Sequence, residues 1–173
     1  MSALTKILPT ETDLREIASF YKSCFNEPEK GENWTNETAH SYFLERNNEG
    51  SLFATLTNEN NDLIGICCGS DYKNSFISNE LEYDFDKCFY ISLIAIKKDK
   101  RHKGLGSHML SQYCDIIKSH TYQNIIVRCR AENLQMRGAL KQNGFDEIRT
   151  YNATLGGVTC KRIISYKALT HSK

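Results

Sequence analysis

Residues 88–106 read CFYISLIAIKKDKRHKGLG and decide how the rest of the chain is interpreted. The first half of this stretch, 88–96, is dense in apolar and β-forming residues and predicts a buried strand. The second half ends in Gly104-Leu105-Gly106 and opens a segment with an apolar helical face. A strand that feeds a glycine turn and then a helix leaves unpaired backbone N–H groups at the helix start. Such a turn can bind a phosphate group.

Outward from this stretch, the hydrophobic pattern predicts an α/β fold with a mixed central sheet of about six to seven strands and about four helices. We expect a single domain over 1–173, because no linker or repeat interrupts the pattern. The expected elements are strand 5–8, helix 14–25, helix 35–46, hairpin 51–57 and 63–69, helix 105–117, strand 125–129, helix 132–142, and hairpin 145–151 and 158–168.

The segment 71–87 is less regular. Acidic residues alternate with apolar ones at Glu80, Glu82, Asp84 and Asp86. A period of two is typical of an extended strand. The pattern therefore predicts an extended edge segment with one acidic face.

Composition excludes several classes of protein. The net charge of +1 gives no reason to expect a nucleic-acid binder, and no apolar stretch approaches the roughly 20 residues of a membrane span. Most of the seven cysteines lie inside apolar runs and show no metal-like spacing. We therefore expect buried thiols in the reducing cytoplasm and no metal site.

The glycine turn has competing interpretations. It could be an ordinary strand-to-helix turn that uses glycine for a positive φ. A dinucleotide fingerprint would need a third glycine where Met109 stands and an acid near Asn124, and a Walker loop would need Gly-Lys-Ser/Thr. Neither is present, so NAD and ATP are disfavoured.

Arg101-x-x-Gly104-x-Gly106, between this strand and this helix, resembles the acetyl-CoA motif of the GNAT N-acetyltransferase superfamily, written Q/R-x-x-G-x-G/A. Downstream, Val127-x-Cys129-x-x-x-Asn133 and a helix that leads into Gly144-Phe145 are similar to the next strand and helix of that family. The resemblance covers nearly the whole chain and implies a GNAT fold.

The resemblance also implies acetyl-CoA as co-substrate. Backbone groups on the buried strand would pair with the pantetheine amides, and amides of 102–107 would hold the pyrophosphate. Asn133 would reach the pantetheine arm, although it could equally be a helix N-cap. The cofactor-binding residues predicted in this way are Ile94, Ala95, Ile96, Arg101, His102, Lys103, Gly104, Leu105, Gly106, Ser107 and Asn133.

The catalytic residues are less well defined. Leu140 stands where many family members carry a tyrosine that protonates the leaving thiolate, and Tyr90, Tyr151 or Cys129 could substitute for it. Tyr90 also occupies the position where some relatives have a glutamate base. A carboxylate of the acidic segment could accept the proton through a water. The predicted catalytic residues are Tyr90 and Glu82.

The sequence thus predicts an N-acetyltransferase that moves an acetyl group from acetyl-CoA to a primary amine by direct attack in a ternary complex. The alternatives are a CoA-binding module with little or no catalysis, and a nucleotide-binding regulator. The resemblance implies an acceptor site built from about 26–34 and 151–157. The acidic segment favours a basic acceptor such as a polyamine, an aminoglycoside or a lysine, and a protein N-terminus stays open. Nothing in the sequence indicates an oligomeric state.

Overall fold

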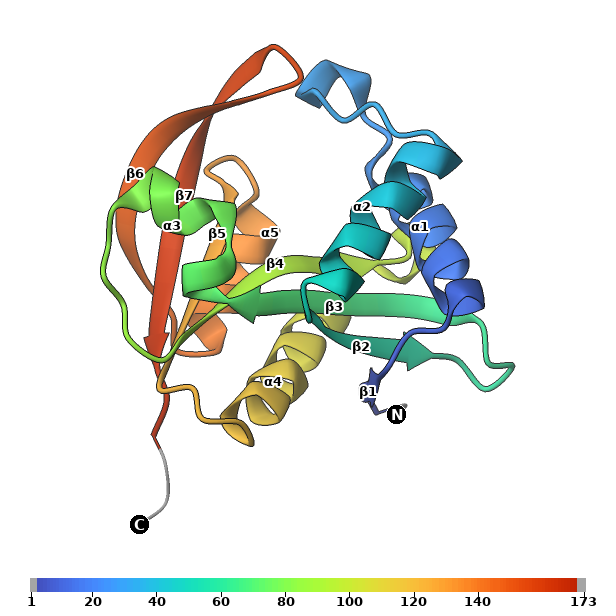
Figure 1. The fold of residues 1–173 in the computed structure, drawn as a ribbon, viewed down its shortest axis with the longest axis horizontal. Helices are drawn as coiled ribbons and strands as arrows, with labels where there is room; N and C mark the ends of the chain where they lie inside the picture. Colours follow the sequence, from blue (N-terminus) through green and yellow to red (C-terminus); the bar gives the residue numbers. More distant parts are fainter. Residues whose placement is uncertain (1–2, 171–173) are drawn as a thin grey trace.

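Seven strands form one mixed sheet in the order β1-β2-β3-β4-β5-β7-β6 in the computed structural model, which describes residues 3–170 (Figure 1). Within that range β4 and β5 form the one parallel pair, and every other neighbouring pair is antiparallel. The strands are β1 (Thr5–Ile7), β2 (Leu52–Thr57), β3 (Leu63–Asp71), β4 (Cys88–Ile96), β5 (Asn124–Arg130), β6 (Asp146–Leu155) and β7 (Val158–Ala168).

Helices cover both faces of the sheet. The helices are α1 (Glu11–Phe25), α2 (Asn36–Asn48), α3 (Phe76–Leu81), α4 (Leu105–Lys118) and α5 (Leu134–Gln142), and the 3₁₀ turns are η1 (Pro28–Lys30), η2 (Tyr72–Asn74) and η3 (Lys98–Lys100). In Figure 1, α1 and α2 lie above β2 and β3, and α4 lies below them. Thr10 and Thr35 begin α1 and α2 with capping boxes, which satisfy amides that a helix start leaves unpaired.

Three apolar clusters hold these layers together. The largest packs α4 and α5 against one face of the sheet and includes Phe89, Tyr113 and Val127. The second packs α1 and α2 against the other face, and the third lies under α3 around Tyr90 and Ile164. The predicted α/β class, strand count and helix count are confirmed. Within residues 3–170 no helix has both the length and the apolar character that a membrane crossing requires.

The prediction of an extended acidic edge over 80–86 is wrong. Phe76–Leu81 form the short helix α3, and Glu82 ends it in the left-handed region with φ of 57°. Ile77 and Leu81 are four residues apart and both are buried, which is helical spacing. The segment adds no strand to the sheet, whose order is β1-β2-β3-β4-β5-β7-β6.

One extra residue in β4, Ser92, bends this central strand. Leu93 is opposite Cys68 and Ile91 is opposite Gly69, so Ser92 has no partner residue on β3. Its hydroxyl donates to the carbonyl oxygen of Cys68 at 3.1 Å. A bulge of this kind bends a strand and increases its twist. The parallel pairing between β4 and β5 ends at Ile91, immediately before the bend.

Gly69 provides the space for this bend. A Cβ atom at Gly69 would lie 2.4 Å from the Phe89 ring and 2.4 Å from the carbonyl oxygen of Tyr90. The carbonyl is backbone and cannot rotate away. Any side chain at this position would therefore push β3 and β4 apart beside the bulge.

We expect Gly69→Ala to lower the free energy of unfolding by about 2 kcal/mol, the typical cost of overpacking, as measured by urea denaturation. Gly138→Ala is the matched control, because Gly138 is helical and a Cβ there meets nothing within 4 Å. The control should raise stability by roughly 0.5–1 kcal/mol. Equal effects of the two substitutions would contradict the packing described for Gly69.

Candidate functional site

A cleft opens where β4 and β5 separate. The two strands pair in parallel from Cys88 with Asn124 to Ile91 with Val127, and no further. Beyond that point β4 stays paired with β3 as far as Ile96, and β5 stays paired with β7 as far as Arg130. The second half of β4 therefore has β3 on one side only. A ligand with amide groups can pair with the free side as if it were a strand.

The turn after β4 lies at one end of this cleft. His102 and Gly104 adopt positive φ values of 65° and 73°. Gly104 is the N-cap of α4, and no side chain caps the helix. The first amides of α4 have no helical acceptor, and the helix dipole places partial positive charge at the same point. This end of the cleft is therefore suited to an anion such as a phosphate.

Arg101 fixes the turn to its surroundings. Its Nε donates to the carbonyl oxygen of Ile96 at 3.0 Å, and its NH2 donates to the carbonyl oxygen of Cys24 at 3.4 Å. These bonds connect the turn to β4 and to the end of α1. The guanidinium of Arg101 is thus hydrogen-bonded within the protein, and the carbonyl oxygen of Ile96 already accepts a hydrogen bond.

A cavity of about 290 Å³ collects most of the predicted cofactor residues. Lys103 is the one member of the predicted set that does not line it. The predicted residues that do line it are Ile94, Ala95, Ile96, Arg101, His102, Gly104, Leu105, Gly106, Ser107 and Asn133.

The start of α5 forms the opposite wall of this cavity. Asn133 is the N-cap of α5, and its Oδ1 accepts from the amide of Met136 at 3.1 Å. Gln135 contacts the ring of His102 across the cavity. At the other end of α5, the side chain of Asn143 donates to Ser107 Oγ at 2.9 Å. The two helices are therefore tied together on both sides of the turn.

A second cavity of about 680 Å³ continues from the first along the cleft, and Ile94, Arg101 and Asn133 line both. Its far wall comes from the loop after α1. Gly31 in that loop touches the tip of the β6–β7 hairpin, where its Cβ would lie 2.0 Å from the carbonyl oxygen of Leu155. Figure 1 shows the hairpin and the loop meeting at the top of the molecule. The contact joins the loop that lines the larger cavity to the β6–β7 hairpin.

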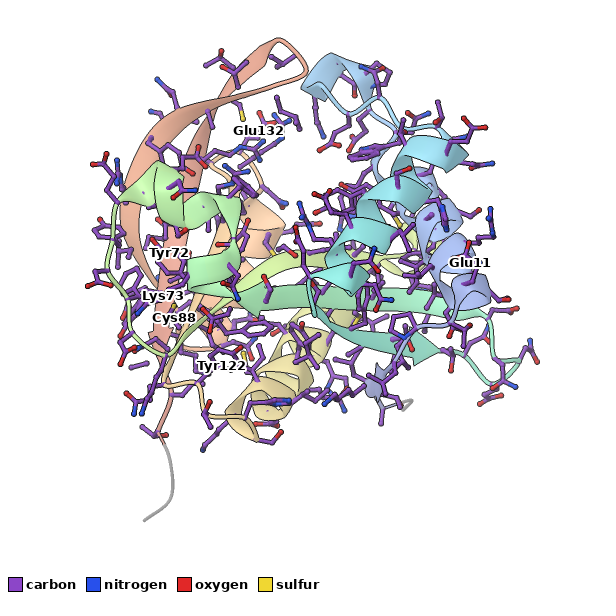
Figure 2. The ribbon with its side chains drawn as sticks, in the orientation of Figure 1. Glu11, Tyr72, Lys73, Cys88, Tyr122 and Glu132 are labelled. Carbon is purple, nitrogen blue, oxygen red and sulfur yellow. The ribbon has the colours of Figure 1, made fainter. Side chains whose placement is uncertain are left out.

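The larger cavity is rich in charged side chains, several of which the sequence did not indicate as functional. Figure 2 marks one of them, Glu132, just beyond the end of β5. Arg128 and Arg130 alternate with apolar residues on β5. This alternation is visible in the sequence, but the sequence does not show which face of the sheet the two side chains occupy. The charged residues of the lining are Glu27, Lys30, Glu32, Arg101, Arg128, Arg130, Glu132 and Arg162. The expected acceptor range 26–34 therefore contributes residues to the lining of the larger cavity. The expected range 151–157 contributes none.

Tyr90 and Glu82, the predicted catalytic residues, do not lie together. Tyr90 is buried under α3, where burial raises its pKa to about 12. It borders, with Ser92, a smaller cavity on the α2 side of β4. Glu82 is exposed at the end of α3, and it lines none of the three cavities described above.

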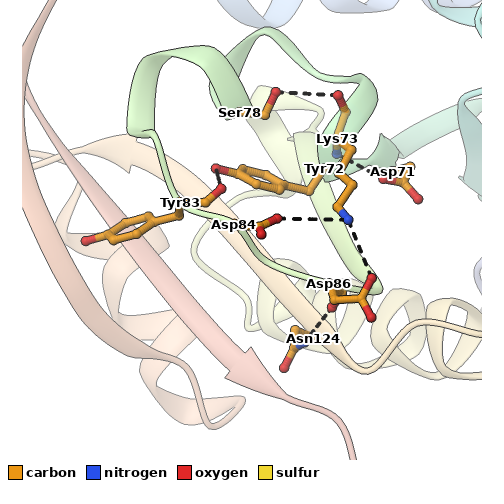
Figure 3. A network of polar contacts seen from close by, with 8 residues as sticks. All are labelled: Asp71, Tyr72, Lys73, Ser78, Tyr83, Asp84, Asp86 and Asn124. Atoms are coloured by element: carbon orange, nitrogen blue, oxygen red, sulfur yellow. Dashed lines mark hydrogen bonds and ion pairs between the residues drawn. The ribbon is translucent and has the colours of Figure 1, made fainter.

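Asp84 and Asp86 of that segment face Lys73 in the polar network of Figure 3. Asp84 and Asp86 lie 4.0 Å and 3.5 Å from the ammonium nitrogen of Lys73, and their side chains are 98% and 80% exposed. Glu80 pairs with Arg128 at 2.9 Å. These carboxylates do not line the larger cavity and so give it no acidic wall.

Leu140 lies in the core between α5 and the sheet, with 1% of its surface exposed. Its side chain therefore contributes packing. Cys129 does line the larger cavity, and burial raises the pKa of its thiol to about 11. Among residues 3–170 no three His, Cys, Asp or Glu side chains are grouped so that they could hold a metal ion.

Comparison with known proteins identifies the family. Residues 14–145 match the model of the Acetyltransferase (GNAT) family. No curated protein sequence matches the chain.

Solved structures share the fold. One is a GNAT superfamily phosphinothricin acetyltransferase from Sinorhizobium meliloti in complex with AcCoA, with a TM-score of 0.73, 17% identity, and coverage of 97% of this chain and 88% of that one. Another is the ribosomal-protein-S18-alanine N-acetyltransferase from Escherichia coli, with a TM-score of 0.71, 18% identity, and coverage of 100% and 97%. A GNAT family acetyltransferase from Bacillus cereus has a TM-score of 0.67, 20% identity, and coverage of 99% of both chains.

The reactivity of the cysteine thiols tests the burial of the side chains described above. All seven cysteines are free and Cys160 is the only one not buried. At a pKa of about 11, roughly one Cys129 thiol in a thousand is ionised at pH 8. We expect DTNB at pH 8 to modify one thiol rapidly in the native protein and seven in urea. Cys160→Ser should abolish the rapid phase, and a second rapid thiol would contradict the burial described.

Proposed function

This chain belongs to the GNAT acetyltransferase family, and from that premise we propose that it transfers an acetyl group to a primary amine by direct attack of the amine on the thioester. Acetyl-CoA is the co-substrate. The observation that supports this most is the continuity of the cleft. The free side of β4 beyond Ile91 leads from the uncapped start of α4 into the larger cavity.

Each part of the cleft suits one part of the reaction. The amides at Gly104 to Ser107 would hold the pyrophosphate, and the free side of β4 would pair with the pantetheine amides. The thioester would then lie near the bulge at Ser92, which lines the larger cavity. The amine would enter from that cavity. Holding both reactants in one cleft lowers the entropic part of the barrier.

Direct attack is favoured over a covalent acetyl-enzyme. Cys129 is the one thiol in the lining of the larger cavity, and its raised pKa keeps it protonated near neutral pH. A thiol is a poor nucleophile compared with a thiolate. An amine held beside the thioester needs no such intermediate.

The acceptor must lose a proton before or during attack, because a lysine-like amine with a pKa near 10.4 is about 99.9% protonated at pH 7. Among the carboxylates of the larger cavity, Glu27 is held by Lys30 at 2.8 Å and Glu132 is 67% exposed. We assign the proton-accepting role to Glu32, which is half-buried and accepts a hydrogen bond from the indole nitrogen of Trp34. Tyr90 and Glu82 stay sequence-based predictions for acid or base.

The contact between Gly31 and the hairpin tip lies beside the loop that lines the cleft, and it favours a small acceptor over a long chain. One of the similar structures is a phosphinothricin acetyltransferase, and another is a ribosomal-protein-alanine N-acetyltransferase. The shared fold therefore does not identify the acceptor. We also propose a cytoplasmic location, which free buried thiols favour.

Binding of acetyl-CoA tests the cofactor end of the cleft. Gly104→Val should raise the dissociation constant for acetyl-CoA at least tenfold by calorimetry, because it forces a β-branched residue to positive φ at the phosphate-binding amides. Gly157→Val is the matched control, with φ of 78° against 73° and no atom within 4 Å of either Cβ. The control should bind acetyl-CoA normally. Equal weakening by both variants would contradict the assignment of acetyl-CoA to this end of the cleft. Absence of CoA release with every amine tried would contradict the proposed acetyl transfer.

Replacement of Glu32 tests proton removal. We expect Glu32→Gln to lower kcat/KM for the best acceptor at least tenfold at pH 7, and by less at pH 9.5. The loss shrinks as pH rises because solvent then deprotonates the amine without help. Glu29→Gln removes an exposed carboxylate from the same loop and is the control. A deficit that is constant with pH would indicate that Glu32 only supports the loop.

A further inference from the structure

Three arginines of the larger cavity lie on the same face of neighbouring strands. Arg130 on β5 is directly opposite Arg162 on β7 in the antiparallel register. Arg128 is two residues before Arg130, so it points to the same face. All three line the larger cavity. Like charges placed opposite each other destabilise a sheet, so the cluster calls for an explanation other than folding.

The three arginines differ in their partners. Arg128 is paired with Glu80 at 2.9 Å and donates to the hydroxyl of Tyr151 at 3.2 Å. Arg130 donates to the carbonyl oxygen of Lys30, and its NH1 lies 4.0 Å from Glu132. Both guanidinium groups therefore have acceptors within the protein.

Arg162 has no such partner within residues 3–170. Its Nε is buried and has no hydrogen-bond acceptor, and no carboxylate oxygen lies within 4.0 Å of its guanidinium. Burial lowers the pKa of Arg162, and the charges of Arg128 and Arg130 lower it further. Even so, a guanidinium stays charged at neutral pH. Arg162 is half-buried, and a buried donor nitrogen without an acceptor is costly, which indicates that an anion belongs beside it.

The charge of the whole cavity points the same way. Its lining carries five cationic side chains against three carboxylates. Glu32 is the carboxylate whose charge acts on Arg162, and it is not close enough to form an ion pair. A ligand with one anionic and one amine group would therefore meet an arginine and a carboxylate in the same cavity.

We propose that Arg162, together with Arg130, binds an anionic group of the acceptor, so that the acceptor is a small primary amine that also carries a carboxylate or a phosphonate. This rests on the proposed acetyl transfer and names the class of amine. The planar guanidinium matches the two oxygens of either acid in a bidentate pair. The same cavity disfavours the polyamines and aminoglycosides that the acidic segment suggested, because they bring further positive charge to a lining with five cationic side chains and three carboxylates.

The test compares amino acids with their own amides. Release of CoA is measured with alanine, methionine, phenylalanine and β-alanine, with the carboxamide of each, and with 1-aminoethylphosphonate. The carboxamide has the same shape without the charge. It also lowers the pKa of the α-amine more than the carboxylate does, so a preference for the acid cannot come from more free amine. We expect kcat/KM at least tenfold higher for the acid in the best pair, and the phosphonate arm shows which anion is preferred.

Variants assign the preference to Arg162. Arg162→Gln should bring the acid and the amide within threefold of each other and leave kcat/KM for the amide within threefold of the parent. Arg162→Lys keeps the charge but not the planar fork and should retain part of the preference. Lys161→Gln removes an exposed cation from the neighbouring position, outside the cavity lining, and should change nothing. An unchanged dissociation constant for acetyl-CoA shows that each variant is folded.

The two levels of the proposal fail differently. Turnover of amides, polyamines or peptide N-termini in preference to the acids would overturn the anionic acceptor and leave acetyl transfer intact. A preference for acids that survives Arg162→Gln would overturn the role of Arg162. Binding of acetyl-CoA without turnover of any amine would contradict the acetyl transfer itself.

Discussion

The extra residue in β4 is the constraint on which the site depends. Ser92 interrupts the register with β3, and the bend that follows carries β4 away from β5 after Ile91. Without the bend, the parallel pairing could continue, and the backbone groups of β4 that we propose pair with acetyl-CoA would be bonded to β5. Gly69 is part of the same bulge, because its missing side chain leaves the space into which Phe89 and Tyr90 pack.

The elements that the sequence predicted well are those whose signal is local. The strand 88–96, the glycine turn and the helix after it are contiguous, and their apolar spacing is unambiguous. The cavity at the start of α4 is lined largely by this one stretch, so ten of the eleven predicted cofactor residues lie together there. Lys103 is predicted from the place of its backbone amide in the turn, and it does not line this cavity.

The errors and omissions have non-local causes. The alternation at 80–86 predicts a strand because a period of two over seven residues also arises outside strands, and only the tertiary structure shows that the segment joins no sheet. The arginine cluster was missed for a related reason. Arg130 and Arg162 are 32 positions apart, and they become neighbours through the β5–β7 register. No periodicity in either strand reveals that register.

The two halves of the cleft therefore differ in how they relate to the fold. The half that we propose for the cofactor comes mostly from one continuous stretch that also forms the centre of the sheet, so changing it disturbs the core. The acceptor half is assembled from the loop after α1, the end of β5 and the strand β7, which meet only in the tertiary structure. Side chains there, such as Arg162 and Glu32, can change without loss of the fold. A shared fold and cofactor are then compatible with different acceptors, and the charges of the acceptor half, rather than the fold, carry the information about which amine reacts.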